Sequence, residues 1–173
     1  MRFPAKLCAI ALAVAIVLTG CGGNRQTGEA AKPDSAPTQT PVYAPPEGTF
    51  LIKAQKPEIR SYGNMTEYTF LGANKHGFPL LHVSVITFAA PGSGATPPVS
   101  LDQYQRSYAS LPGAAVTSKD IAQGTYTGRE LSITGQGAPG MVRIYSVNGR
   151  TYLLEWNPTV AGSTETADTF EIP

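Results

Sequence analysis

Catalysis requires polar or nucleophilic side chains that converge on one point, and few residues of this chain meet that requirement. His76 falls in a predicted turn and His82 in a predicted strand, and the pair lacks a metal-binding spacing. Ser93 has one glycine on each side, which is not the Gly-x-Ser-x-Gly pattern of a nucleophile elbow. Glu130 and Glu155 lie in separate predicted strands, where each is expected to face solvent or an arginine. The sequence therefore predicts no enzymatic activity, no metal site and no cofactor.

Four residues of one predicted hairpin suggest a binding function instead. Arg143, Tyr145, Arg150 and Tyr152 fall on the same face of that hairpin. Arginine and tyrosine are enriched at protein interfaces, so one hypothesis is a partly exposed aromatic–arginine patch that contacts a partner. The alternative is that both arginines lay their apolar stems over neighbouring side chains at the edge of the sheet.

A reactive residue of a different kind lies near the N-terminus. Residues 1–6 carry two basic side chains, and Leu7–Leu18 is an uncharged apolar run of 12 residues. A membrane-spanning helix needs about 20 apolar residues, so this shorter run is typical of a secretory signal peptide. The run ends in Leu18-Thr19-Gly20-Cys21. This motif resembles the lipobox of bacterial lipoproteins.

The lipobox resemblance implies a lipid anchor. Cleavage between Gly20 and Cys21 would make Cys21 the first residue, with a diacylglycerol on its thiol and a third acyl chain on its amine. Each buried CH₂ contributes about 0.8 kcal/mol, so two or more chains anchor a protein stably. The alternatives are a secreted protein with a chance cysteine and an uncleaved membrane helix. An aspartate directly after the cysteine would resemble an inner-membrane retention signal, but this chain has Gly22 there. The absence of that aspartate favours the outer membrane, facing the periplasm or the surface, if the organism has two membranes.

The charge balance and the cysteine content restrict the possible functions further. The chain has 13 basic and 12 acidic residues, and loss of Arg2 and Lys6 with the signal peptide would leave one more acidic than basic residue. This balance gives no electrostatic support for nucleic-acid binding. Cys8 would also leave with the signal peptide, and Cys21 would be acylated, so no disulfide is expected.

The predicted organisation has three parts. Residues 1–20 are the signal peptide, residues 21–48 are the lipidated cysteine and a flexible tether, and residues 49–173 are one folded domain. The tether is rich in Pro, Gly, Ala, Thr and Gln, and only Val42 and Tyr43 have bulky apolar side chains. Such a segment buries too little surface to offset the entropy of ordering it.

The folded part has the pattern of a β-sheet with one or two helices. Short runs of alternating or β-branched residues separated by turns predict strands. Ser100 followed by Gln103 resembles a capping box at the start of a helix that ends at Pro112-Gly113. The expected strands are residues 49–53, 65–71, 80–88, 114–121 and 125–134 and the two arms of residues 141–156, and a short closing helix is expected over residues 164–170.

The hairpin of residues 141–156 predicts its own register. Asn148-Gly149 favours a two-residue type I′ turn, because both residues tolerate positive φ. Tyr145 then faces Tyr152, and Met141 faces Trp156. Both faces of this hairpin carry apolar residues, so we expect cover on both sides of the sheet. The fold class is therefore α+β, with an antiparallel sheet of about six strands and one or two packed helices.

Residues 49–173 contain the segments FLIKAQKP, SLDQYQRSYASLPG, GRELSITGQGAPGMVRIYSVNGRTYLLEW and the closing TADTFEIP. These segments and their order resemble the PsbP-like fold of extrinsic photosystem proteins and small bacterial lipoproteins. The resemblance implies a non-catalytic binding or assembly module at a membrane surface, and no ligand residues can be carried over.

Together these observations predict an exported, lipid-anchored protein of the cell envelope that binds a partner, expected to be another envelope protein. Two rival functions remain. A small-ligand carrier predicts a sizeable pocket between helix and sheet. A hydrolase predicts convergent titratable groups with perturbed pKa values, which the sequence does not show.

Overall fold

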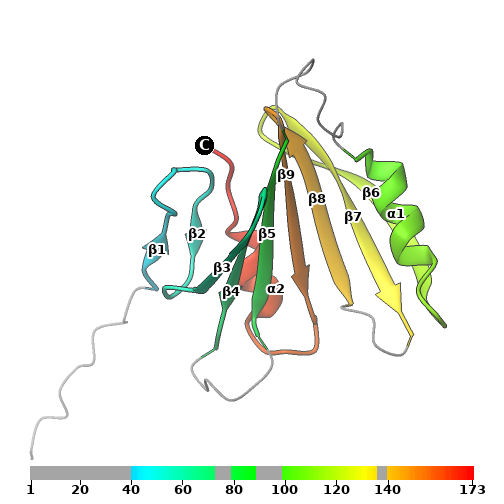
Figure 1. Ribbon diagram of the computed structural model, residues 1–173. Helices are drawn as coiled ribbons and strands as arrows, with labels where there is room; N and C mark the ends of the chain where they lie inside the picture. The colour runs from blue at the N-terminus through cyan, green and yellow to red at the C-terminus, as the bar shows by residue number, and fades with distance from the viewer. Residues whose placement is uncertain (1–39, 73–78, 89–98, 136–139) are drawn as a thin grey trace, which may run out of the picture. The chain divides into compact units, whose positions relative to one another are not determined.

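We describe the protein from a computed structural model, in which the described residues are 40–72, 79–88, 99–135 and 140–173. They form a seven-stranded antiparallel sheet, a separate two-stranded sheet and two helices (Figure 1). The predicted α+β class with an antiparallel sheet is confirmed. Within these ranges neither helix has the length and apolar content needed to cross a membrane.

The large sheet has the strand order β3-β4-β5-β9-β8-β7-β6, so β3 and β6 are its edges. Each strand pairs antiparallel with its neighbours. The strands are β3 (Glu58–Tyr62), β4 (Met65–Phe70), β5 (Leu81–Thr87), β6 (Ala115–Gln123), β7 (Tyr126–Thr134), β8 (Met141–Val147) and β9 (Arg150–Trp156).

The hairpin of β8 and β9 has the predicted register. Tyr145 lies opposite Tyr152, and Met141 lies opposite Trp156. The turn residues Asn148 and Gly149 have φ of 50° and 72°, as a type I′ turn requires. Because side chains alternate between faces, this register determines which residues of the central strands meet each helix.

Helix α1 (Leu101–Ala109) covers one face of the sheet. Ser100 caps it by accepting a hydrogen bond from the Gln103 N–H at 3.2 Å, as the capping-box pattern predicts. Tyr104 and Tyr108 turn toward the sheet, so they are packing residues of this face. They pack with a small core of Leu131, Ile133, Val142 and Ile144.

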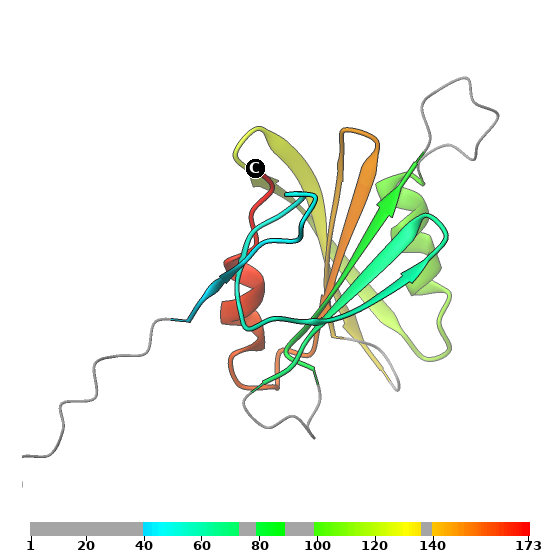
Figure 2. The ribbon, with the colours of Figure 1, turned by 60° about the vertical axis from the view of Figure 1, so that its left-hand side comes forward.

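Helix α2 (Ser163–Asp168) lies on the opposite side of the sheet, as Figure 2 shows. The larger core gathers there, and Phe170, just after the helix, is 2 % exposed within it. The predicted closing helix is confirmed, and so is the expectation that both faces are covered. Phe170 is the aromatic residue that holds the C-terminal segment in this core.

Two strands, β1 and β3, were not predicted from the sequence. Val42 and Tyr43 form β1, which pairs with β2 (Ile52–Lys53). The sequence predicts these two residues as part of the tether. In the structure the Tyr43 ring lies 5.7 Å from the Phe70 ring, and this aromatic contact offsets the cost of ordering the segment. The folded part therefore begins before Thr49. The second, β3, was not predicted because all five of its residues are exposed and its sequence has no buried face.

Candidate functional site

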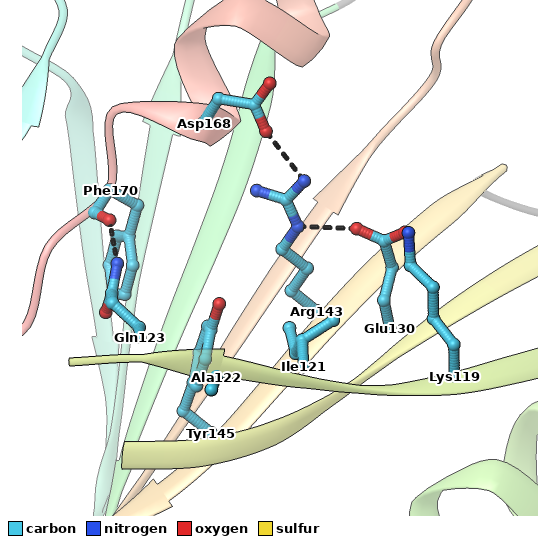
Figure 3. Close-up of a pocket in the computed structure, with 9 residues that line it drawn as sticks. All are labelled: Lys119, Ile121, Ala122, Gln123, Glu130, Arg143, Tyr145, Asp168 and Phe170. Carbon is cyan, nitrogen blue, oxygen red and sulfur yellow. Dashed lines mark hydrogen bonds and ion pairs between the residues drawn. The ribbon is translucent and has the colours of Figure 1, made fainter. Parts of the chain in front are cut away.

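A cavity of about 360 Å³ lies between strands β6–β8 and the segment that contains α2 and Phe170 (Figure 3). Its polar lining comes from two distant parts of the chain. Lys119, Gln123, Glu130 and Arg143 lie on the sheet, and Asp168 lies at the end of α2. Polar groups of both charges thus converge at one position on this face.

Four of these side chains form a continuous chain of ion pairs. The Lys119 Nζ lies 2.7 Å from the Glu130 Oε1, and the Arg143 Nε donates to the Glu130 Oε2 at 2.7 Å. The Arg143 Nη2 lies 2.6 Å from the Asp168 Oδ1. Figure 3 shows Arg143 between the two carboxylates. The guanidinium also lies over the Trp156 ring, 5.0 Å from its centroid, which is a cation–π geometry.

The sequence places these partners opposite one another through strand register. Glu130 of β7 faces Lys119 of β6 and Arg143 of β8. Cross-strand pairs of opposite charge stabilise an antiparallel sheet. Glu130 is only 7 % exposed, so its negative charge needs both cations.

The ion pairs change the acidity of both central groups. Burial alone would raise the pKa of Glu130, but the hydrogen bonds and charges of Lys119 and Arg143 together outweigh burial and lower this pKa. Burial alone would lower the pKa of Arg143, and its bonds to Glu130 and Asp168 raise it instead. Both groups therefore stay charged at neutral pH.

The acid sensitivity of folding should report this lowered pKa. The folded pKa of Glu130 lies below the ordinary value of 4.5, so its stabilising effect is complete above that pH and is lost as the pH falls through the folded pKa. We expect Glu130→Gln to lower the free energy of unfolding at pH 7 by about 1–3 kcal/mol. As the pH falls through the folded pKa of Glu130 the two proteins should converge, as measured by urea unfolding at several pH values below 4.5. Parallel curves over the whole range would contradict the assignment.

Tyr145 supplies a hydroxyl to the same cavity. Its ring packs directly over Gly128 of β7, where an added Cβ would lie 2.6 Å from the ring. This close approach holds the ring upright, and Figure 3 shows the hydroxyl pointing toward α2. In the part of the chain that the structure describes, no residue hydrogen-bonds to this hydroxyl. Burial raises the pKa of Tyr145, so the hydroxyl stays protonated and can donate.

The Gln123 side chain joins the cavity to the C-terminal segment. Its amide nitrogen donates to the Phe170 carbonyl, and its oxygen accepts from the Ile172 N–H at 3.3 Å. These bonds fix the wall of the cavity opposite Arg143.

The predicted aromatic–arginine patch does not form an exposed surface, and this corrects that expectation. Tyr145 and Tyr152 are 4 % and 2 % exposed, because α2 and Phe170 cover the face that they share. The Tyr152 hydroxyl donates to the Thr49 carbonyl at 3.1 Å within the core. Arg143 lines the cavity, whereas Arg150 lies near the turn of the hairpin, opposite Val147.

The other polar residues singled out in the sequence lie on the face of α1. His82 is half-buried, and its Nε2 lies 3.3 Å from the Thr69 Oγ1. Glu155 accepts a hydrogen bond from the Tyr108 hydroxyl of α1. Burial, followed by the Glu155 charge, raises the pKa of Tyr108. Glu130 and Glu155 therefore lie on opposite faces of the sheet and do not meet.

Some predicted residues lie outside the described part of the chain. They are Gly20 and Cys21 of the lipobox, His76 and Ser93. Across the described ranges, no group of three or more His, Cys, Asp or Glu side chains is placed to hold a metal ion.

Three residues of the cavity were not predicted from the sequence: Lys119, Gln123 and Asp168. Lys119 and Gln123 alternate along the exposed edge strand β6 with Ile121 between them on the same face. That pattern indicates a half-polar strand, but it does not indicate a cavity. Asp168 reaches Arg143 only after the chain folds back across the sheet.

Of three comparisons with known proteins, only the comparison with solved structures gives a match. No protein-family model matches the chain, and no curated protein matches it. Among solved structures, the chain is similar to the cyanobacterial PsbP (CyanoP) from Synechocystis sp. PCC 6803, determined in solution. The two chains share 10% sequence identity with a TM-score of 0.38, over 84% of this chain and 100% of the other.

Proposed function

We propose that this chain is an exported lipoprotein, anchored by acyl chains on Cys21, whose domain binds a polar partner at the cell envelope and does not catalyse a reaction. The lipobox-like Leu18–Cys21 supports the anchor. The cavity beside α2 supports the binding function. In this proposal the domain is a PsbP-like module, as the motifs of residues 49–173 imply.

The charge-balanced cavity is the observation that carries the binding function. A general acid or base works best with a pKa near the operating pH. The pKa of Glu130 is lowered and that of Arg143 is raised, so both move away from neutrality. Groups that stay charged hold a fixed geometry, and this suits recognition of a partner better than proton transfer.

The exposed polar side chains at the opening of the cavity indicate the kind of partner. The side chains of Lys119 and Asp168 are 68% and 54% exposed, so each can offer part of its charge to a partner. The Tyr145 hydroxyl adds a neutral donor. The site therefore fits a polar segment of another envelope protein that carries both a donor and a carboxylate or carbonyl.

A small-ligand carrier is the second candidate, because ligand pockets have volumes of about 300–1,000 Å³ and this cavity of about 360 Å³ is large enough. Its lining is more polar than that of most ligand pockets, which would restrict the ligand to a polar molecule.

The anchor is tested on the full chain expressed in a bacterium with the lipoprotein pathway. We expect Cys21→Ser to abolish incorporation of labelled palmitate and to release the protein from the membrane fraction. Mass spectrometry of the N-terminal peptide should show three acyl chains on Cys21 of the wild type. An unmodified Cys21 in a membrane-bound protein would overturn the anchor.

The binding site is tested by mild crosslinking in native membranes, with Tyr145→Phe and Lys119→Ala as the variants. We expect both to reduce capture of one defined partner, while Tyr104→Phe and Lys56→Ala, which lie away from the cavity, leave it unchanged. If a small molecule co-purifies instead, native mass spectrometry will show its mass. Equal capture by all variants would contradict the proposed site.

A further inference from the structure

The edge strand β3 leaves its outer side unpaired. All five residues are exposed, including Ile59 at 46 % and Tyr62 at 52 %. Exposed edge strands can pair with another strand, and native proteins usually protect them with prolines or charges. The uninterrupted strand Glu58–Tyr62 has its only nearby proline, Pro57, just before it.

The main-chain groups that point outward follow from the hydrogen bonds within the sheet. The Thr87 N–H donates to the Asn64 carbonyl at 2.8 Å, so Asn64 and every second residue after it, Thr66 and Tyr68, direct their main-chain N–H and C=O toward β5. The residues between them direct these groups toward β3, because main-chain groups alternate between the two neighbouring strands. With the register of Ile59 opposite Tyr68, the N–H and C=O of Ile59 and Ser61 therefore point away from the sheet.

We propose that two copies of this chain pair antiparallel through β3, with a two-fold axis at Ile59. Each Ile59 then exchanges both main-chain hydrogen bonds with Ile59 of the second copy. The Ser61 N–H donates to the Pro57 carbonyl of the second copy. Pro57 has no N–H, so the pairing leaves no donor of that residue unsatisfied.

The charges of β3 select this register. With the axis at Ile59, Glu58 of each copy lies opposite Arg60 of the other, which forms two cross-strand pairs of opposite charge. An axis at Arg60 would place two arginines opposite each other. An axis at Ser61 would place Arg60 opposite Tyr62 and lose both ion pairs. Within the described residues, neither Glu58 nor Arg60 forms an ion pair, so both are available.

The pairing also buries apolar surface. Ile59 is on the face that carries the larger core, directly opposite Tyr68, which is 4 % exposed. Contact between the two Ile59 side chains would extend that core across the axis. The inference does not depend on the cavity, which lies at β6–β8 near the other edge of the sheet.

Cysteine crosslinking of the full chain in native membranes tests the register. Directly opposite residues of a hydrogen-bonded pair have Cα atoms about 5.5 Å apart, which is within disulfide range. We expect Ile59→Cys to give a disulfide-linked dimer under mild oxidation, and the wild type to give none. Ser61→Cys is the matched control, because with the axis at Ile59 its two Cα atoms would lie four residues apart along the paired strands, about 13 Å or more, which is beyond disulfide range.

Charge reversal tests the cause. We expect Arg60→Glu to weaken the dimer of the detergent-solubilised chain roughly tenfold or more, measured as its dissociation constant by sedimentation. Adding Glu58→Arg should restore it, because the pairs then re-form with reversed signs. Melting curves separate this effect from loss of folding.

Four results would overturn the proposal. The first is a stronger crosslink from Ser61→Cys than from Ile59→Cys, which would place the axis at Ser61. The second is a double charge reversal that does not restore the dimer. The third is a monomer at all concentrations. The fourth is a different protein crosslinked to Ile59→Cys, since the occupant would then not be a second copy.

Discussion

Phe170→Ala is expected to lower the free energy of unfolding by about 3–5 kcal/mol. Phe170 is 2 % exposed, and its ring stacks on Phe50 at 5.4 Å and on Tyr145 at 6.2 Å between centroids. Truncation removes these contacts and leaves a cavity that the rigid sheet cannot close. Urea unfolding at pH 7 measures the loss, and the melting temperature should fall by about 10–20 °C.

The effect should extend beyond the lost side chain. The segment after α2 pairs with the small sheet, where the Leu51 N–H donates to the Glu171 carbonyl at 2.8 Å. Loss of the Phe170 anchor should therefore increase hydrogen exchange at Leu51 as well. Tyr62→Ala is the control, because Tyr62 is 52 % exposed and should cost little. A loss below about 1 kcal/mol for Phe170→Ala would show that this segment does not close the core.

Arg143→Met is expected to lower the free energy of unfolding by about 3 kcal/mol. Methionine keeps the apolar stem but removes the cation that Glu130 and Asp168 share. Glu130 is 7 % exposed and would keep only Lys119 as a partner. The loss lies at the low end of the range for broken buried pairs, because the Lys119 ammonium can still compensate part of the charge.

A double variant separates the ion pair from simple packing. Removing one partner of a buried pair costs more than removing both, because the remaining charge is no longer compensated. Arg143→Met with Glu130→Gln should therefore be less destabilised than the sum of the single variants, as measured by urea unfolding. Arg106→Met, on the exposed side of α1, is the matched control and should change stability by less than about 0.5 kcal/mol. Strictly additive losses would contradict the pairing.

Local sequence signals predicted the elements that depend on local chemistry. The Asn148-Gly149 turn set the register of β8 and β9, because few other turns match the twist of the strands. Ser100 and Gln103 marked the start of α1, because a helix end needs a side chain to satisfy its free N–H groups. The alternation of Leu81, Val83 and Val85 identified the buried face of β5.

The missed strands had no local signal of that kind. β3 is exposed along its whole length, so its residues show no burial pattern, and it forms because β4 offers unpaired main-chain groups. β1 forms because the Tyr43 ring packs with Phe50 and with two rings of β4, Tyr68 and Phe70. The residues next to β3 or β1 in the sequence therefore do not reveal that either strand forms.

The sequence alone determined the class of fold, the hairpin register, the capped helix and the lipobox-like Leu18–Cys21, because each depends on residues close together in the chain. Only the tertiary structure decided that β5 pairs with β9, that Tyr145 and Tyr152 are buried, and that Asp168 meets Arg143. The physical reason is that these contacts join segments far apart in sequence. Their formation depends on how all the strands and both helices share the two faces of one sheet.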